Sequence, residues 1–251
     1  MSGKVIFESE NHKVVFFEEL TPASAVQSNQ YLIIHNGEGM LLDPGGHKVF
    51  SQLKRDISPH ISPGKLRYIF LSHQDPDIVA ALNGWLLTTN AEAYISKLWL
   101  RFLPHFGLEK NFEERVKPIE DKGTRLDLNG CELLILPAHF LHSPGNFQVY
   151  DPCSKILFSG DLGASLNQPY FFVENFEEHI KYMEGFHKRY MASNKILKLW
   201  ANMVRKLDIE MIAPQHGAIF KGKELVNKFI NWAENLKCGV DLMDESIYSL
   251  P

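Results

Sequence analysis

A buried strand that ends in a cluster of metal-binding residue types constrains this fold more than any other feature. Leu66–Leu71 is a short, largely apolar run that suits a strand buried on both faces. The segment after it carries His73, Asp75 and Asp77 at alternating positions, and Pro76 can begin a helix there. Three metal-capable side chains at the exit of a buried strand make half of a metal site. The fold must therefore bring further ligands to this point.

Three more candidate ligands lie in the second half of the chain, each at the end of a strand pattern. His142 sits in a loop with Pro and Gly between two strands, Asp161 follows an apolar strand and a glycine, and His216 lies just past a short strand. Loops at strand ends let a rigid scaffold bring side chains together from distant parts of a sequence. Each motif alone is a weak signal, but their common position predicts one shared site.

Three imidazoles and three carboxylates are too many for one tetrahedral zinc ion, which takes about four ligands. The set suits two metal ions a few ångströms apart, with one carboxylate bridging them. None of these candidates is a cysteine, which argues against an iron–sulfur cluster or a structural zinc site. Mixed imidazole and carboxylate ligands with open positions are typical of non-haem iron.

The remaining pattern predicts an α/β protein with two sheets and helices outside them, in one domain over residues 1–251. Strands are expected at Lys4–Glu8, Lys13–Glu19, Gln30–His35, Gly39–Leu42, Leu66–Leu71, Glu92–Ser96 and Glu210–Ala213, with hairpins over Arg125–Leu136 and Phe147–Phe158. Helices are expected at His47–Ile57, from Pro76 through Leu87, at Leu98–Phe106, over Phe176–Leu207 with a break near Ser193, and at Lys223–Leu236.

Composition excludes several classes of partner. The net charge is −4 with both signs well mixed, so no basic face for nucleic acid is expected. The N-terminus lacks the apolar core of a signal peptide, and no apolar run is long enough to span a membrane. The cysteines, Cys131, Cys153 and Cys238, are widely spaced and odd in number. They are expected to be reduced thiols of a cytoplasmic protein.

The ligand motifs resemble those of the metallo-β-lactamase fold, and within it the flavodiiron proteins. They are HQDPD at His73–Asp77, HSP at His142, SGD ending at Asp161 and PQHG around His216. The spacings agree, with 65 positions from Asp77 to His142, 19 to Asp161 and 55 to His216, and the resemblance covers nearly the whole chain. It implies an αβ/βα sandwich of two mixed sheets with helices on the outer faces.

The resemblance also implies a diiron centre. One iron would take His73, Asp75 and His142, and the second Asp77 and His216, with Asp161 bridging both. Two positions depart from the family pattern H-x-E-x-D-H: Asp75 replaces a glutamate and reaches less far, and Ile78 replaces a histidine. The second iron should therefore keep a water or an open position.

Flavodiiron proteins also carry a flavodoxin domain with FMN, and this chain shows no phosphate-binding Gly-rich loop. The expected cofactor is thus two iron ions without FMN, in a stand-alone core of the oxygen-binding diiron type. Any electrons would come from another protein. A homodimer of the metal domain is compatible with the sequence.

The leading hypothesis is a cytoplasmic diiron protein that binds O2 or NO as a sensor or carrier. Two ferrous ions supply two of the four electrons that reduce O2 to water, so without a built-in flavin bound O2 could persist. The resemblance implies coupling to a signalling partner such as a chemotaxis receptor. One alternative is an O2 or NO reductase with an external flavodoxin- or rubredoxin-type donor. Another is a zinc hydrolase, although those usually have HxHxDH where this chain has Asp75 and Ile78.

Several polar residues also fit simpler roles. Asp75 and Asp77 could merely cap a helix, where Asp is favoured, and Asp43 could be a turn residue or could hold the first ligand loop. His139, three residues before His142, could be a ligand or a group that orients one. Surface or capping positions are expected for His12, His35, His47, His60, His105, His179 and His187.

Overall fold

The computed structural model describes residues 3–22 and 25–250, in which two mixed β-sheets are found. The strands of the first sheet lie in their order along the chain. β1 to β4 pair antiparallel, whereas β4 to β7 run parallel. This sheet contains β1 (Lys4–Glu8), β2 (His12–Phe17), β3 (Gln30–His35), β4 (Glu38–Leu42), β5 (Leu66–Phe70), β6 (Glu92–Ser96) and β7 (Val116–Ile119).

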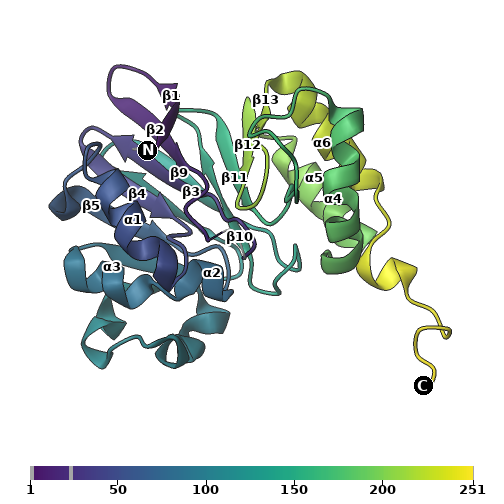
Figure 1. Cartoon of the computed structure of the whole chain (residues 1–251), viewed down its shortest axis with the longest axis horizontal. Helices are drawn as coiled ribbons and strands as arrows, with labels where there is room; N and C mark the ends of the chain where they lie inside the picture. Colours follow the sequence, from purple (N-terminus) through teal and green to yellow (C-terminus); the bar gives the residue numbers. More distant parts are fainter. Residues whose placement is uncertain (1–2, 23–24, 251) are drawn as a thin grey trace.

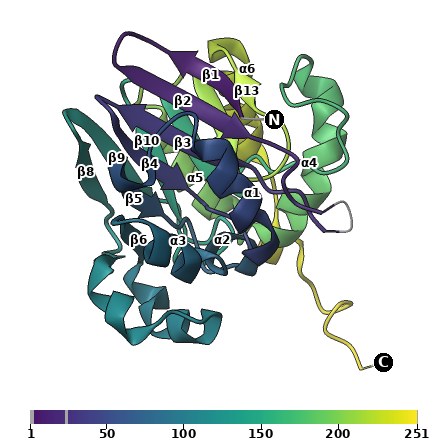
Figure 2. The same ribbon diagram turned by 60° about the vertical axis from the view of Figure 1, so that its left-hand side comes forward.

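The second sheet has the order β13-β12-β11-β10-β9-β8. Its pairs are antiparallel except for β11 and β12, which run parallel. Figure 2 shows β8 at the outer edge of this sheet. The strands are β8 (Thr124–Leu128), β9 (Cys131–Pro137), β10 (Phe147–Asp151), β11 (Ile156–Gly160), β12 (Met211–Pro214) and β13 (Phe220–Lys221).

Helices cover the outer faces of the two sheets (Figure 1), with α1 to α3 on the side of the first sheet and α4 to α6 on the side of the second. The helices are α1 (His47–Ile57), α2 (Pro76–Val79), α3 (Leu82–Thr88), α4 (Phe176–Tyr190), α5 (Asn194–Val204) and α6 (Lys223–Asn235). Short 3₁₀ helices are η1 (Pro63–Lys65), η2 (Lys97–Phe106), η3 (Lys110–Arg115) and η4 (Gly239–Leu242).

Alternation along the strands explains this layering. In β2, Val14 and Phe16 pack between the two sheets, whereas Val15 and Phe17 pack under the helices of the first sheet. Successive side chains of a strand point to opposite faces, so a strand that is apolar at every position needs cover on both sides. The αβ/βα sandwich of two mixed sheets with outer helices is thereby confirmed.

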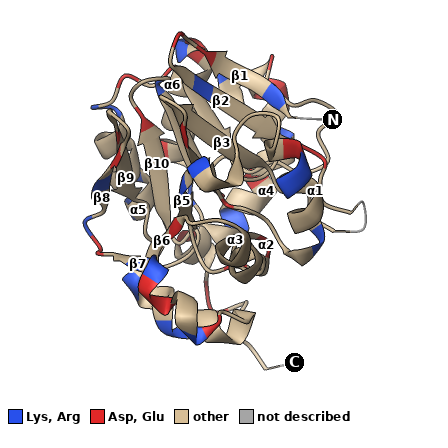
Figure 3. Ribbon diagram, turned by 90° about the vertical axis from the view of Figure 1, so that its left-hand side faces the viewer, with Lys and Arg blue, Asp and Glu red and all other residues tan. Residues whose placement is uncertain are grey.

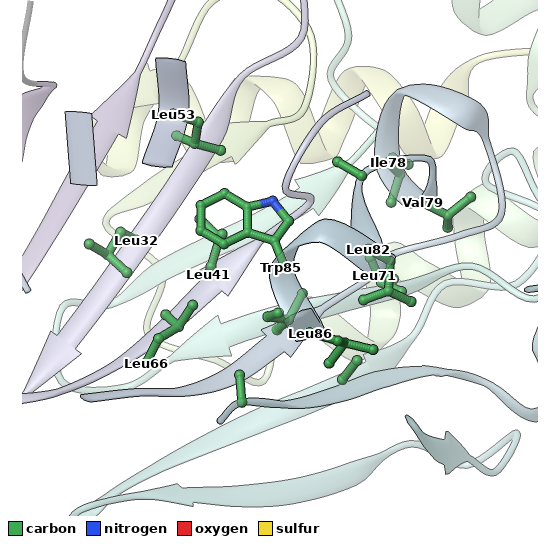
Figure 4. Close-up of a cluster of buried hydrophobic side chains, with 14 of the residues drawn as sticks. Leu32, Leu41, Leu53, Leu66, Leu71, Ile78, Val79, Leu82, Trp85 and Leu86 are labelled. Atoms are coloured by element: carbon green, nitrogen blue, oxygen red, sulfur yellow. The ribbon is translucent and has the colours of Figure 1, made fainter. Parts of the chain in front are cut away.

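Trp85 anchors the layer between the first sheet and its helices (Figure 4). Its ring lies among Leu41, Leu66 and Leu86, and the side chain is 2% exposed. An aromatic side chain of this size contributes much of the apolar area buried in such a layer. The layer fixes α2 and α3 against the end of β5, and it is there that the ligand loop begins.

Three details differ from the sequence-based expectations. The helix expected from Pro76 through Leu87 is two helices, because the chain turns at Ala80–Ala81 between α2 and α3. The segment expected as a helix at Leu98–Phe106 is the 3₁₀ helix η2, which contains Pro104. Strand β7 was not expected because Pro118 interrupts its pattern; the strand lies at the sheet edge, where proline is tolerated.

The prediction that all cysteines are reduced thiols was wrong. Cys131 and Cys153 form a disulfide, which joins the start of β9 to the turn after β10. In the antiparallel pairing of these strands Leu134 lies opposite Tyr150. Extending this register by three residues places Cys131 opposite Cys153. The pairing thus follows from the sheet register, which the spacing of 22 residues along the chain did not reveal.

Figure 3 marks the acidic and basic residues along the ribbon, and positions of both signs are interspersed over the elements seen in this view. Among the described residues, no helix is long and apolar enough to cross a membrane. The single domain expected over residues 1–251 stays a prediction.

Candidate metal centre

The candidate ligands meet at one edge of the sandwich because they follow strands that end there. His73, Asp75 and Asp77 follow β5, and Asp161 follows β11. His216 follows β12, which is parallel to β11. His142 follows β9, which points the same way as β11 because both pair antiparallel with β10. Side chains distant in the sequence therefore converge at the carboxyl ends of these strands.

The first group of ligand atoms consists of His73, Asp75, His142 and Asp161, with one atom from each residue lying within 4.8 Å of the others. Nε2 of His73 lies 3.5 Å from Oδ2 of both Asp75 and Asp161. Nε2 of His142 lies 3.4 Å from Oδ2 of Asp75 and 2.7 Å from Oδ2 of Asp161. The shorter side chain of Asp75 thus still reaches both imidazoles.

The second group consists of Asp77, His216 and the other oxygen of Asp161. Nε2 of His216 lies 3.4 Å from Oδ2 of Asp77 and 3.5 Å from Oδ1 of Asp161. Asp161 therefore presents Oδ2 to one group and Oδ1 to the other. A carboxylate placed in this way can bridge two metal ions.

Asp75 is the N-cap residue of α2, yet its side chain makes no capping hydrogen bond within the described residues. It turns instead toward His73 and His142. Helix capping therefore does not explain Asp75. Pro76 begins the helix with the fixed backbone angle suited to a first turn, which leaves the preceding aspartate extended and free to face the site.

Hydrogen bonds orient two of the imidazoles. Nδ1 of His73 lies 2.9 Å from Oγ of Ser72, and Nδ1 of His216 lies 2.7 Å from the carbonyl oxygen of Gln27. Partners on Nδ1 direct Nε2 into the site, as ligand-orienting groups do in metal proteins. Asp43 supports the same loop, because its Oδ1 accepts a hydrogen bond of 2.8 Å from the backbone N–H of Ser72. Burial raises the pKa of Asp43 to about 6.

In the metal-free site, positively charged imidazolium groups lie next to negatively charged carboxylates. Burial alone would lower the pKa of His73, but the nearby carboxylates of Asp161 and Asp75 raise it to about 10. Burial likewise opposes ionisation of His142, whose carboxylate partners raise its pKa to about 9. The two histidines in turn hold the pKa of Asp75 and Asp161 below the usual range, against the effect of burial. An imidazole must lose its proton before it can bind a metal.

Two unpartnered buried atoms indicate that the donor set suits metal ions. Nε2 of His73 and Oδ1 of Asp161 are buried, and neither has a hydrogen-bond partner among the described residues. Buried polar atoms without partners are costly unless something binds them. Donors that share one ion at about 2.1 Å lie roughly 3 Å apart, close to the spacing found in both groups. Imidazole and carboxylate donors without thiolates favour iron or manganese over softer metals.

Two supporting residues were missed by the sequence analysis. Nε2 of Gln215 donates a hydrogen bond of 3.1 Å to Oδ2 of Asp77 from a side chain that is 2% exposed. His187, in α4, accepts a hydrogen bond of 2.9 Å at Nε2 from the backbone N–H of Gly163, in the loop after Asp161. Burial lowers the pKa of His187 to about 4 and keeps it a neutral acceptor. Gln215 precedes a proposed ligand directly, which is the one sequence signal that could have found it.

The remaining histidines differ from expectation in two ways. One possible ligand lies outside the site, and several histidines expected at the surface are buried. His139 contacts the carbonyl oxygen of Asp121 at 2.8 Å and is not part of the ligand group. The expectation of surface or capping positions was wrong for four residues, because they are buried: His12, His35, His179 and His187. A buried imidazole needs polar partners, and a single sequence does not show where they are.

Ile78, at the position of the missing histidine, is fully buried in the layer around Trp85 (Figure 4). Its side chain therefore serves the hydrophobic core of the first sheet. A histidine here would have to leave that core to reach a metal ion.

Comparisons with known proteins agree with this geometry. A solved structure described as "Peroxy diiron species of chemotaxis sensor ODP" is 47% identical, with a TM-score of 0.88, and the match covers 98% of this chain and 100% of the other. The uncharacterised protein MJ0732 of Methanocaldococcus jannaschii is 28% identical over 214 residues, which are 82% of this chain and 53% of the relative. An anaerobic nitric oxide reductase flavorubredoxin of Klebsiella pneumoniae is 26% identical over 228 residues, 82% of this chain and 44% of the relative.

The chain thus spans about half the length of these two curated relatives. The family model described as "ODP family beta lactamase" matches residues 26–217, which include every residue proposed as a ligand. Because this match covers most of the chain, the protein belongs to the ODP family of β-lactamase-like proteins.

Proposed function

We propose that this protein binds O2 at a diiron centre and acts as an oxygen sensor. One iron would be held by His73, Asp75 and His142 and the other by Asp77 and His216, with Asp161 placed to serve both. When bound, the two ferrous ions supply the electrons and open positions that O2 needs. The role of this chain's residues would be to hold both ions close together.

The observation that carries the proposal is the placement of Asp161. Its Oδ2 faces His73 and His142, its Oδ1 faces His216, and the residue is 3% exposed. A single metal ion would need only one of these groups, whereas a bridged pair uses both. The choice of O2 and of signalling rests on the 47% identical solved structure, which is described as a peroxy diiron species of a chemotaxis sensor.

A measurement of steady-state O2 consumption distinguishes an oxygen sensor from an O2-reducing enzyme. Protein loaded with iron is mixed with NADH and an external flavin reductase, and O2 is followed with an electrode. A sensor consumes O2 stoichiometrically with its iron and then stops, because it lacks rapid re-reduction. Sustained turnover of many O2 molecules per diiron centre would exclude this function.

A reductase is the second candidate, favoured by the similarity to a nitric oxide reductase flavorubredoxin. In this case the electrons would come from a flavodoxin- or rubredoxin-type protein. The same assay with NO in place of O2 tests it, since a reductase would form N2O continuously. A zinc hydrolase is disfavoured because Asp75 supplies a carboxylate to the site at the position where such enzymes carry an imidazole. Two zinc ions per chain in protein produced with ample iron would reverse that judgement.

The signal would leave through a partner protein, by analogy with the chemotaxis sensor among the similar structures. A receptor of the chemotaxis type is the class we propose. The cytoplasmic location stays a prediction, as does a homodimer.

A further inference from the structure

A second group of metal-ligating side chains lies at the other end of the sandwich. His12 and His35 lie directly opposite each other, at the start of β2 and the end of β3. Cys131 begins β9, and Cys153 lies in the turn between β10 and β11. The two histidines belong to the first sheet and the two cysteines to the second, so the group joins the sheets.

This group is distinct from the proposed diiron centre. β11 (Ile156–Gly160) begins just after the turn that carries Cys153 and ends just before Asp161. At about 3.3 Å per residue, this strand separates the two sites by roughly 17 Å. No residue is shared between the two groups of ligand atoms found in the described part of the chain.

The four side chains are close enough to share one ion. One ligand atom from each lies within 4.8 Å of the others. The Nδ1 atoms of His12 and His35 face each other at 3.1 Å. Nitrogen atoms bound to one tetrahedral ion at about 2.0 Å lie roughly 3.3 Å apart. His12, His35 and Cys131 are buried, while Cys153 is exposed and lines a surface groove together with Phe7 and Glu8. An ion could reach the site from that side.

Asp151 orients the first of these imidazoles. Its Oδ2 lies 2.7 Å from Nε2 of His12, and the carboxylate is fully buried. If His12 carries its proton on Nε2, Nδ1 is left as a lone pair that points at His35. A carboxylate behind a ligand imidazole is the usual arrangement in zinc proteins.

We propose that His12, His35, Cys131 and Cys153 bind one thiophilic divalent metal ion, Zn²⁺ by preference, when the two cysteines are reduced. Two thiolates and two imidazoles make the ligand set of structural zinc sites. The diiron centre has no sulfur ligand, so the two sites differ in the metals they select.

The disulfide between Cys131 and Cys153 and the metal-bound form exclude each other, because both use the same sulfur atoms. A dithiol reductant converts one into the other by exchange: the protein disulfide becomes two thiols, and the dithiol becomes a disulfide. Binding of Zn²⁺ then displaces one proton from each thiol. Metal binding would therefore occur only under reducing conditions, and the ion would hold the two sheets together in place of the covalent bond within the second sheet.

Co²⁺ alone is the probe, because a thiolate-bound tetrahedral Co²⁺ ion has an intense sulfur-to-metal charge-transfer band. The full chain is freed of metal, reduced with a phosphine and then titrated with Co²⁺. The phosphine is oxidised to the phosphine oxide and takes its oxygen atom from water. We expect one Co²⁺ per chain to develop this band, and one equivalent of Zn²⁺ to abolish it. The disulfide form should not develop the band. A reduced protein without the band would overturn the proposal.

Substitutions distinguish binding of Co²⁺ at the four-residue site from binding by the two thiols alone. His35→Gln should weaken Co²⁺ binding at least ten-fold, and Cys153→Ser should reduce the charge-transfer intensity. His216→Ala, which alters only the proposed diiron centre, should leave the band unchanged. Unaltered affinity in His35→Gln would show that the histidines are not ligands.

If His35→Gln fails to fold, a second measurement decides the question. X-ray absorption at the zinc edge, on reduced Asp161→Asn protein with one Zn²⁺, should give two sulfur and two nitrogen neighbours. A zinc ion with only oxygen and nitrogen neighbours would contradict the proposal.

Discussion

Oδ2 of Asp161 lies 2.7 Å from Nε2 of His142, while Oδ1 of the same carboxylate faces His216 at 3.5 Å. This relationship divides the site into two groups of ligand atoms that share one residue. Both groups follow strands that end at the same edge of the sandwich, so the sheets determine the distance between them.

Asp161→Asn should abolish the second iron. The amide is nearly the same size but neutral, and its nitrogen cannot bind a metal ion in place of the second oxygen. We expect iron content to fall from two per chain to one or less, measured by elemental analysis after anaerobic loading. Asp121→Asn, at an exposed position, is the matched control and should retain both ions. Two irons in Asp161→Asn would argue against a bridging role.

Gln215→Leu should weaken the second iron selectively. Gln215 donates a hydrogen bond to Asp77, which belongs to the second group only. Loss of a group that orients a ligand typically costs about 10- to 100-fold in metal affinity. Competition with a chelator should show one iron of normal affinity and one weakened. Gln52→Leu on α1 serves as the control, and equal weakening of both ions would contradict the assignment.

Metal binding should release about two protons at pH 7, one each from His73 and His142. The pKa of these groups is raised to about 10 and about 9, so both are protonated in the metal-free protein. Calorimetry in buffers of different ionisation enthalpy counts the protons. Release of none at pH 7 would mean that the imidazoles are already neutral.

The same shifts predict how stability depends on pH. A histidine whose pKa is raised by folding stabilises the protein fully below about pH 6.5, and this contribution is lost as the pH rises through the folded value. The melting temperature of the metal-free protein should therefore fall between about pH 7 and 10. With metal bound these imidazoles are neutral, and the decline should be smaller. Identical profiles for the two forms would contradict this account.

Ile78→His should destabilise the protein without adding a metal ligand. Ile78 is fully buried in an apolar layer, so an imidazole there lacks partners and costs about 2–4 kcal/mol. Chemical denaturation measures the loss, and Ile78→Val is the control, at about 1 kcal/mol. If the variant keeps its stability and changes the spectrum of the iron-loaded protein, the histidine reaches the metal and the packing argument fails.

The sequence predicted most of the strands and the group of candidate ligands that the structure brings together, because both follow from local patterns. The apolar run Leu66–Leu71 and the polar residues after it mark a strand and its exit loop within a dozen positions. The same holds for Asp161 and His216. What these patterns could not show was contact across the sheets. His12, His35 and the disulfide depend on strand register, and single residues such as Gln215 act through partners far away in the chain.

The departure at Ile78 illustrates the same limit. The sequence shows correctly that no histidine stands there, but the open position on the second iron was inferred from a resemblance alone. Only the packing around Trp85 shows that this side chain belongs to the core.

The most direct test of the diiron account is the absorption spectrum of protein loaded anaerobically with two Fe²⁺ ions and then exposed to O2. The account predicts a coloured species that forms with one O2 per two irons and persists, and that Asp161→Asn does not form. Immediate conversion to the spectrum of two ferric ions, or no change on exposure to O2, would contradict it.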